Sequence, residues 1–283
     1  MPKHPAAPTH TQTILDRNPD RWTNRILIGT PMTGLVRSEW VVGRYGQTIP
    51  TNWSHIEVMQ WLSSYIPLQY QVSDAENIIA KHVVERNFEW LLFIEHDNVL
   101  PPQTFVKLNQ YMLRGDVPVV GALYFTKSEP PEPMIYRQPG WGYYRDWHFG
   151  DKVWCRGVPF GCTLIHGSII RALWDESPEY LVGNVPTRRI FKTPDNVFYD
   201  PDSNDFINHQ GTTDLQFCDE VISKGIFTKA GWPQYAKKKY PFLIDTSIFV
   251  KHIDNDGVQW PTYIPKEFAP RPAKSSAPAK ESK

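Results

Sequence analysis

The chain has 283 residues, which is enough for one large domain with a substantial core. Hydrophobic residues make up 41% of it and aromatic residues 13%, and this composition excludes an intrinsically disordered protein. Lys plus Arg and Asp plus Glu number 30 each, so no overall positive field recruits nucleic acid, although Lys237, Lys238 and Lys239 form a local basic run.

Residues 1–22 and 265–283 are rich in small, polar and proline residues without periodicity, so we expect flexible tails around one folded domain at 23–264. No apolar stretch approaches the roughly 20 residues that cross a bilayer, and we expect no membrane span. Three cysteines without paired metal spacing indicate reduced thiols and a cytoplasmic location. A zinc site from Cys155, Cys162 and a histidine is the alternative.

The first predicted elements alternate between strands and helices. Residues 25–31 form a short apolar strand that Pro31 ends. Ser54 and Glu57 have the spacing of a capping box, which predicts the start of a helix. A second strand is predicted over residues 67–72.

Ser73 and Glu76 repeat the capping-box spacing before a segment of helical periodicity, so another helix is predicted there. The large apolar run at residues 90–94 follows directly. The order strand, helix, strand, helix, strand is typical of a βαβ sheet. The predicted fold class is therefore α/β, with a mixed, mainly parallel central sheet flanked by helices.

The apolar run ends abruptly in two acidic residues, Glu95 and Asp97, which indicates a buried strand that carries two carboxylates to the edge of the sheet. Because a strand alternates its faces, these two side chains point the same way and His96 points the other way. Two carboxylates on one side can hold a divalent cation that neutralises a phosphate. Pro101 and Pro102 then end the strand and start a helix, so the acids are predicted at a tight turn. An acidic loop without a ligand is the alternative.

The next predicted elements are a helix over residues 104–113, which Gly115 ends, and a buried strand over 117–124. Residues 128–154 are rich in Pro, Gly, Trp and Tyr and are expected to form irregular loops. Exposed aromatic rings there suit stacking on sugars or bases, and packing inside an irregular β-lobe is the alternative. Glycines in the segment 157–165 let the backbone approach a ligand closely.

A second irregular region at residues 175–211 is a candidate lid. Thr213 then begins a capping-box pattern that places Asp214 in the first turn of a helix, where the helix dipole favours the ionised acid. An aspartate held this way is a credible general base, and a capping role is the alternative. His252 follows a last strand, predicted over 242–250, and either completes a metal site or is structural.

In this order the pieces resemble the GT-A-type nucleotide-sugar glycosyltransferases, in particular the small family-two-like members of bacteria and their phages. The matching pieces, within about residues 25–255, are Thr-Pro after the first strand, acid-x-Asp, Pro-Pro, Gly-Cys-Thr-Leu-Ile, Thr-Asp-x-x-Phe-Cys and a closing histidine. The resemblance implies a GT-A-like fold. It also implies metal-dependent transfer of a sugar from a nucleoside-diphosphate sugar, such as a UDP-sugar, to an acceptor hydroxyl with inversion. A retaining outcome stays open.

The resemblance further implies roles for individual residues. The nucleotide sugar is expected to contact five of them, Thr30, Pro31, Asn77, Glu95 and Asp97. Asp97 and His252 would bind Mn²⁺ or Mg²⁺, and Asp214 would deprotonate the acceptor hydroxyl. The acceptor and sugar side is expected to include Trp141, Tyr143, Gly161 and Cys162. Glu95 stands where the family usually has an aspartate.

The acceptor stays open among a glycan, a lipid, a protein and a modified DNA base. A metal-dependent nucleotidyl or phosphoryl transferase is an alternative class, because the same carboxylates on an α/β sheet would serve nucleoside triphosphates. The chain contains no Gly-x-x-x-x-Gly-Lys-Ser/Thr loop for that purpose. A non-catalytic sugar-binding module that uses the Trp and Tyr loops is the other alternative. Turnover of a sugar nucleotide separates the three.

Overall fold

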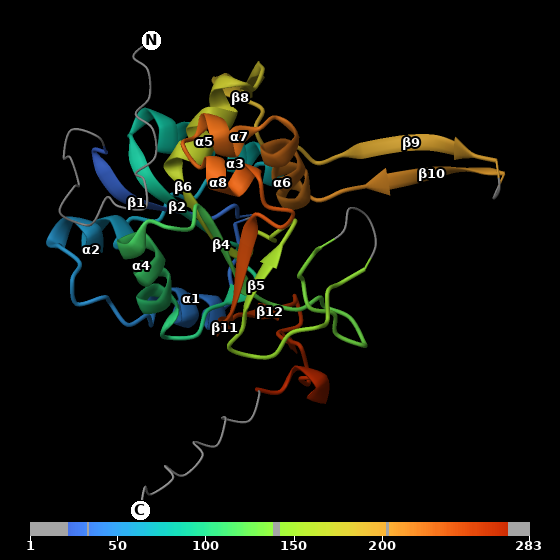
Figure 1. Ribbon diagram of the computed structural model, residues 1–283, viewed down its shortest axis with the longest axis horizontal. Coiled ribbons are helices and arrows are strands. Elements are labelled where there is room, and N and C mark those ends of the chain that lie inside the picture. Colours follow the sequence, from blue (N-terminus) through green and yellow to red (C-terminus); the bar gives the residue numbers. More distant parts are fainter. Residues whose placement is uncertain (1–21, 33, 138–141, 202–203, 271–283) are drawn as a thin grey trace, which may run out of the picture.

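A computed structural model describes residues 22–32, 34–137, 142–201 and 204–270. At its centre lies a six-stranded sheet (Figure 1), whose strands in spatial order are β1 (Asn24–Gly29), β2 (Phe88–Ile94), β6 (Cys162–His166), β4 (Val119–Leu123), β11 (Phe242–Phe249) and β5 (Lys152–Cys155). Strands β1, β2, β4 and β11 run in one direction, and β6 and β5 run against them. This arrangement confirms the predicted α/β class with its mixed, mainly parallel sheet, and it is consistent with a GT-A-like fold.

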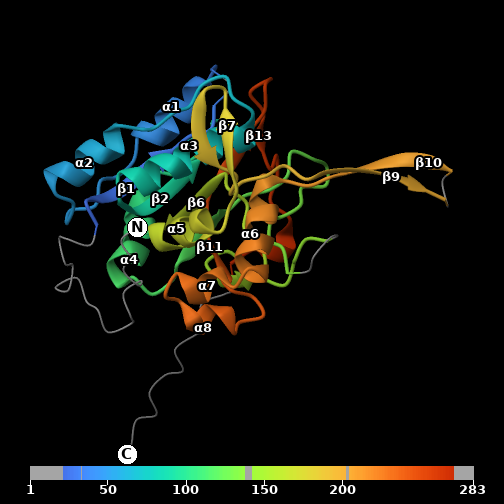
Figure 2. The same cartoon turned by 90° about the horizontal axis from the view of Figure 1, so that it is seen from above.

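Helices cover both faces of the sheet (Figures 1 and 2). The core on one face includes residues of α3 (Val72–Glu85), α5 (Gly167–Asp175), α6 (Thr213–Ser223) and α7 (Ile226–Lys229), with α8 (Pro233–Ala236) following. The core on the other face includes residues of α1 (Ser38–Tyr45), α2 (His55–Leu62) and α4 (Thr104–Arg114). Strand β2 contributes Leu91 and Phe93 to the first core and Trp90 and Leu92 to the second. Burial on both faces explains why its sequence is a continuous apolar run.

Three smaller sheets complete the fold. Their strands are β3 (Asn98–Val99), β12 (Lys251–Ile253) and β13 (Gln259–Trp260) in the first, β7 (Glu179–Val182) and β8 (Val185–Arg188) in the second, and β9 (Asp195–Asp200) and β10 (Asp205–Gln210) in the third. The prediction of an irregular region at 175–211 is therefore wrong, because two antiparallel strand pairs lie within it. Gly183 and Asn204 take positive φ angles in the segments that connect the paired strands. The β9–β10 pair projects from the body of the molecule (Figures 1 and 2) and leads into α6.

The prediction of a strand over residues 67–72 is also wrong. Only isolated parallel bridges form near this segment, between Leu68 and Met32 and between Tyr65 and Gly29. Pro67 has no backbone N–H for a ladder, and Gln69 takes a φ of 65°, which no strand residue adopts.

The predicted capping boxes have different outcomes. The box of Ser54 and Glu57 is present at the start of α2. The box of Ser73 and Glu76 is absent, because α3 begins at Val72 and Glu76 lies fully buried within the helix. The capping residue of α6 is Thr212, which makes no side-chain cap bond, so the box predicted from Thr213 is absent as well.

The folded body extends past residue 264. The 3₁₀ helix η2 (Lys266–Phe268) buries Phe268, whose ring stacks on Trp147 with 4.3 Å between centroids. Of the predicted tails at 1–22 and 265–283, residues 1–21 and 271–283 lie outside the described residues. Within the described ranges, no helix combines the length and apolar character needed to span a membrane.

Candidate active site

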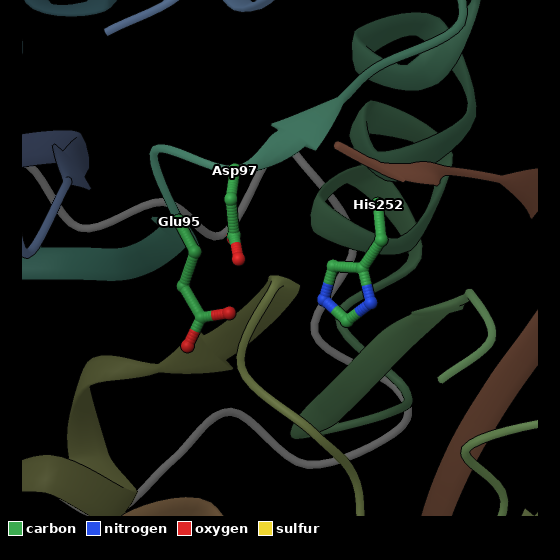
Figure 3. Close-up of side chains that lie close together, drawn as sticks. All are labelled: Glu95, Asp97 and His252. Carbon is green, nitrogen blue, oxygen red and sulfur yellow. The ribbon is translucent and has the colours of Figure 1, made fainter. Parts of the chain in front are cut away.

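Three potential metal ligands converge at the end of β2 (Figure 3). Glu95, Asp97 and His252 each offer one ligand atom, and these atoms all lie within 4.8 Å of one another. Glu95 directly follows β2, and Asp97 lies in the turn before β3. His252 arrives from the far end of the chain because β12 pairs with β3, which places it opposite Asn98. The structure thus brings together the two acids and the histidine singled out from the sequence.

A hydrogen bond fixes the orientation and the tautomer of the His252 imidazole. Its Nδ1 lies 2.7 Å from the carbonyl oxygen of Phe125. A carbonyl can only accept, so Nδ1 carries the hydrogen and Nε2 keeps its lone pair. Burial lowers the pKa of His252, and this outweighs the opposing effect of Asp97, so the ring is neutral at neutral pH. A neutral ring whose other nitrogen donates a hydrogen bond is the usual form of a histidine ligand.

The two carboxyl groups differ in their electrostatics. The pKa of Asp97 is raised by burial but lowered more strongly by His252 and Lys127, and the net pKa lies below its ordinary value. Burial, Asp97 and Asp214 raise the pKa of Glu95 to about 8. Lys127 Nζ lies 2.6 Å from Asp97 Oδ2 and is the cation paired with this acid in the described residues. Once Glu95 loses its proton, two carboxylates and a neutral imidazole form a donor set that fits Mn²⁺ or Mg²⁺, and a bound cation would relieve the repulsion between the acids.

A small pocket adjoins these acids. It has a volume of about 180 Å³ and is lined by Pro31, Met32, Tyr70, Val72, Glu95, His96 and Asp97. Ligand pockets usually hold roughly 300 Å³ or more, so this space would take one part of a larger ligand. Pro31, which was expected to contact the nucleotide, is one of its lining residues. Tyr70, 41% exposed, and Val72 add apolar surface suited to a base, and neither residue carries a sequence signal beyond its apolar character.

Asp214 lies at the start of α6 and is 9% exposed. The backbone N–H of Leu215 donates to its Oδ1 at 2.7 Å. Burial raises the pKa of Asp214, and hydrogen bonds from Thr212 and nearby backbone groups oppose the rise. Because its charge raises the pKa of Glu95, Asp214 lies within electrostatic reach of the three-residue cluster. A carboxylate in this position can accept a proton.

Two further ionisable residues of the site were missed from the sequence. Glu76 of α3 is fully buried, and its pKa is raised well above the ordinary value, mainly by burial and then by Glu95. Thr213 Oγ1 donates to Glu76 Oε1 at 3.1 Å, and Oε2 has no partner among the described residues. In the sequence, Glu76 was interpreted as part of a capping box with Ser73 and not as a site residue. Lys127, the partner of Asp97, is a lone lysine just after a buried strand, which is a weak signal.

Three residues expected at the nucleotide or acceptor are buried in the structure. Thr30 is fully buried. Asn77 is fully buried too. Its Nδ2 donates to the carbonyl of Phe191 at 2.9 Å, and its Oδ1 accepts from the N–H of Ile190 at 2.9 Å. These bonds hold the chain after β8 against α3. Cys162 is buried in β6, where burial raises its pKa to about 12.

Gly161 connects Glu95 to Tyr124 through two hydrogen bonds of its own backbone. Its carbonyl accepts from Glu95 N–H at 3.1 Å, and its own N–H donates to the hydroxyl of Tyr124 at 2.8 Å. A Cβ at this position would lie 2.6 Å from the Tyr124 ring, so only glycine allows this approach. Tyr143 is partly buried, with its ring 5.5 Å from that of Tyr136. Trp141 lies outside the described residues.

The zinc alternative finds no support in the described part of the chain. All three cysteines are buried and free, and the metal-type cluster found there includes none of them.

No family model matches the chain, and no curated protein matches it in sequence. Solved structures with some similarity include A197 from STIV, at 15% identity over 83% of this chain and 88% of that chain, with a TM-score of 0.48. S. aureus TarS matches at 9% identity over 54% of this chain and 30% of that chain, with a TM-score of 0.35. S. aureus TarS 1-349 matches at 10% identity over 52% of this chain and 48% of that chain, with a TM-score of 0.33. Likeness at this level concerns the fold alone.

Proposed function

We propose that the protein is a metal-dependent glycosyltransferase that moves a sugar from a nucleoside-diphosphate sugar, such as a UDP-sugar, to an acceptor hydroxyl with inversion. The observation that carries the proposal is the convergence of Glu95, Asp97 and His252 within 4.8 Å at the end of a central strand. Asp214 adds a buried carboxylate within electrostatic reach of this cluster.

The donor would bind across the acids and the adjoining pocket. Asp97, Glu95 and Nε2 of His252 would hold Mn²⁺ or Mg²⁺, and such a cation stabilises the negative charge of a departing nucleoside diphosphate. Lys127 would donate to a phosphate oxygen once it leaves Asp97. Tyr70 would offer its exposed ring to the nucleobase.

The transfer itself would be carried by Asp214. Its carboxylate accepts the proton of the acceptor hydroxyl, and the oxygen forms a bond to the anomeric carbon. The bond between that carbon and the diphosphate oxygen breaks, and its electron pair leaves with the nucleoside diphosphate. Attack from the face opposite the leaving group inverts the anomeric configuration. Burial raises the pKa of Asp214, which makes it a stronger proton acceptor than a surface aspartate.

Calorimetry of UDP binding with and without Mn²⁺ tests the donor site. We expect Mn²⁺-dependent binding in the wild type and its loss in Asp97→Asn, while Asp219→Asn, an exposed acid of α6, binds as the wild type does. Equal UDP affinity with and without Mn²⁺ would contradict the metal site. A panel of UDP-, GDP- and TDP-sugars then identifies the donor through release of the nucleoside diphosphate and formation of a glycoside. Release of pyrophosphate or transfer of a nucleotide would instead identify the alternative transferase class.

A further inference from the structure

A strip of cations held on aromatic rings runs along the β5 edge of the central sheet. This basic-aromatic strip consists of Arg137, Lys238 and Lys239 together with the rings of Tyr144, Trp154 and Tyr240. Arg137 Cζ lies 3.6 Å from the ring centroid of Tyr144 and 5.0 Å from that of Tyr240. Lys239 Nζ lies 5.3 Å from the Tyr240 centroid, and Lys238 Nζ lies 3.8 Å from that of Trp154. Arg137 Nε also donates to the carbonyl of Trp154 at 3.0 Å, so these contacts form one continuous surface.

The strip keeps its positive charge. Among the described residues, no carboxylate lies within ion-pair distance of Arg137, Lys238 or Lys239, whereas nearby basic residues are paired, as Arg156 is with Asp219. A run of lysines on a solvated face would have mobile side chains. Here aromatic faces hold the cations in place without neutralising them. The strip is therefore prepared for an anionic ligand.

The strip begins beside the candidate active site. Arg137 directly follows Tyr136, which is mostly buried, and burial and the charge of Asp214 raise the pKa of Tyr136. Tyr136 also forms an isolated β-bridge with Gly157, where an added Cβ would lie 2.7 Å from the side chain of Leu215. The strip is thus linked through Tyr136 and Gly157 to the first turn of α6, which carries Asp214.

We propose that the basic-aromatic strip binds a single strand of nucleic acid, and that, if the proposed glycosyltransferase function holds, this strand is the acceptor. The guanidinium fork of Arg137 matches phosphate oxygens, and Lys238 and Lys239 add point charges. Surfaces that bind single strands combine such cations with aromatic rings on which bases stack, and the strip contains both. An acidic peptide would pair with the cations but would not use the aromatic rings for stacking.

Fluorescence anisotropy with a labelled single strand of about 16 nucleotides tests the strip. The double variant Arg137→Gln with Lys238→Gln is compared with Lys81→Gln with Arg86→Gln at the C-terminal end of α3, which changes the net charge equally. We expect affinity to fall about tenfold or more in the strip variant only. The slope of log affinity against log salt, measured between about 50 and 200 mM, should fall by roughly 0.7 for each phosphate that the variant no longer neutralises. Equal weakening in both variants, or in neither, would overturn the proposal.

Tyr240→Ala separates a nucleic acid from other polyanions. We expect it to weaken binding of the strand about fivefold or more, because a base can no longer stack there, and to change binding of inorganic polyphosphate less than about twofold. Polyphosphate or polyglutamate that competes with the strand at equal charge, with Tyr240→Ala silent, would overturn the assignment to nucleic acid. Mn²⁺-dependent UDP binding is measured in the same variants. Its absence in the wild type counts against the proposed function, whereas its retention in a strip variant that no longer binds the strand supports a separate acceptor surface.

Discussion

The hydroxyl of Thr213 donates a hydrogen bond to the fully buried carboxyl group of Glu76, with 3.1 Å between the two oxygens. This bond ties α3 to the first turn of α6, next to Asp214. The pKa of Glu76 is raised well above its ordinary value, mainly by burial and then by Glu95. Protonation of Glu76 keeps the hydrogen bond from Thr213 and avoids a further negative charge close to Glu95 and Asp214.

Glu76→Gln should change the pH dependence of stability. In the unfolded chain Glu76 titrates near pH 4.3, roughly its unperturbed value, and in the folded protein at a higher pH. Its contribution to stability is fully present below the unfolded pKa and is lost as pH rises through the folded pKa. Glutamine keeps an acceptor for Thr213 but cannot ionise. We therefore expect the melting temperature of the variant to exceed that of the wild type at alkaline pH, by about 2–4 °C for each kcal/mol of penalty removed.

Circular dichroism melts at acidic and alkaline pH measure this difference. At acidic pH, below the unfolded pKa, the variant should equal the wild type or melt slightly lower. Glu85→Gln serves as the control, because Glu85 lies on the same helix with an exposed side chain. A difference in melting temperature between Glu76→Gln and the wild type that stays constant at every pH would show that folding does not shift the pKa of Glu76.

Lys127→Ala should strengthen metal binding in the absence of nucleotide. Lys127 Nζ lies 2.6 Å from Asp97 Oδ2 and competes with a cation for this oxygen. The lysine side chain is 33% exposed, so the ion pair is worth only about 0.2–1 kcal/mol, and its removal should raise Mn²⁺ affinity up to about fivefold. Affinity for the nucleoside diphosphate should fall, because a phosphate loses a donor. Calorimetry measures both, with Lys229→Ala, which breaks a distant surface pair with Glu176, as the control.

His252→Ala should weaken Mn²⁺ binding by about tenfold or more, since a direct ligand matters at least as much as the outer partners of a metal site. The carbonyl of Phe125 also loses its donor, which should cost about 1–3 kcal/mol of unfolding free energy. A Mn²⁺ titration and a denaturant melt of the same variant separate the two effects. His55→Ala, an exposed histidine of α2, should change neither. A lowered stability with normal Mn²⁺ affinity would make His252 a structural residue.

The sequence predicted the parts of the site that depend on local pattern. Glu95 and Asp97 follow a strand that is apolar on both faces, and this pattern is readable without any tertiary contact. The place of His252 beside them depends on the pairing of β12 with β3, two short strands far apart in the chain. The pairing of two such short strands cannot be predicted from the sequence of either strand. His252 could be suggested as a ligand but not placed.

Tertiary contacts also changed the meaning of local signals. The spacing of Ser73 and Glu76 fits a capping box, but the helix begins earlier and Glu76 faces Thr213 across the core. Asn77 lies next to it and has every polar atom of its amide bonded to β7 or to the chain after β8. A polar residue on a helix reads as exposed in a sequence, and only the packed structure shows which ones are buried with partners.

The last prediction is that Asp214→Asn retains donor and metal affinity but loses sugar transfer by a factor of about a hundred or more, the usual scale for removing a general base. The amide keeps the size of the carboxylate and can still accept from Leu215 N–H at the start of α6, so the helix should form normally. Asp219→Asn on the same helix, where the acid only pairs with Arg156, is the matched control and should transfer at the wild-type rate. Initial-rate assays with the donor and acceptor in excess measure the transfer, and the anomeric configuration of the product is read by NMR. Near-normal turnover in Asp214→Asn, or retention of configuration in the wild type, would remove Asp214 from the role of base, because a single displacement assisted by one carboxylate must invert the reacting carbon.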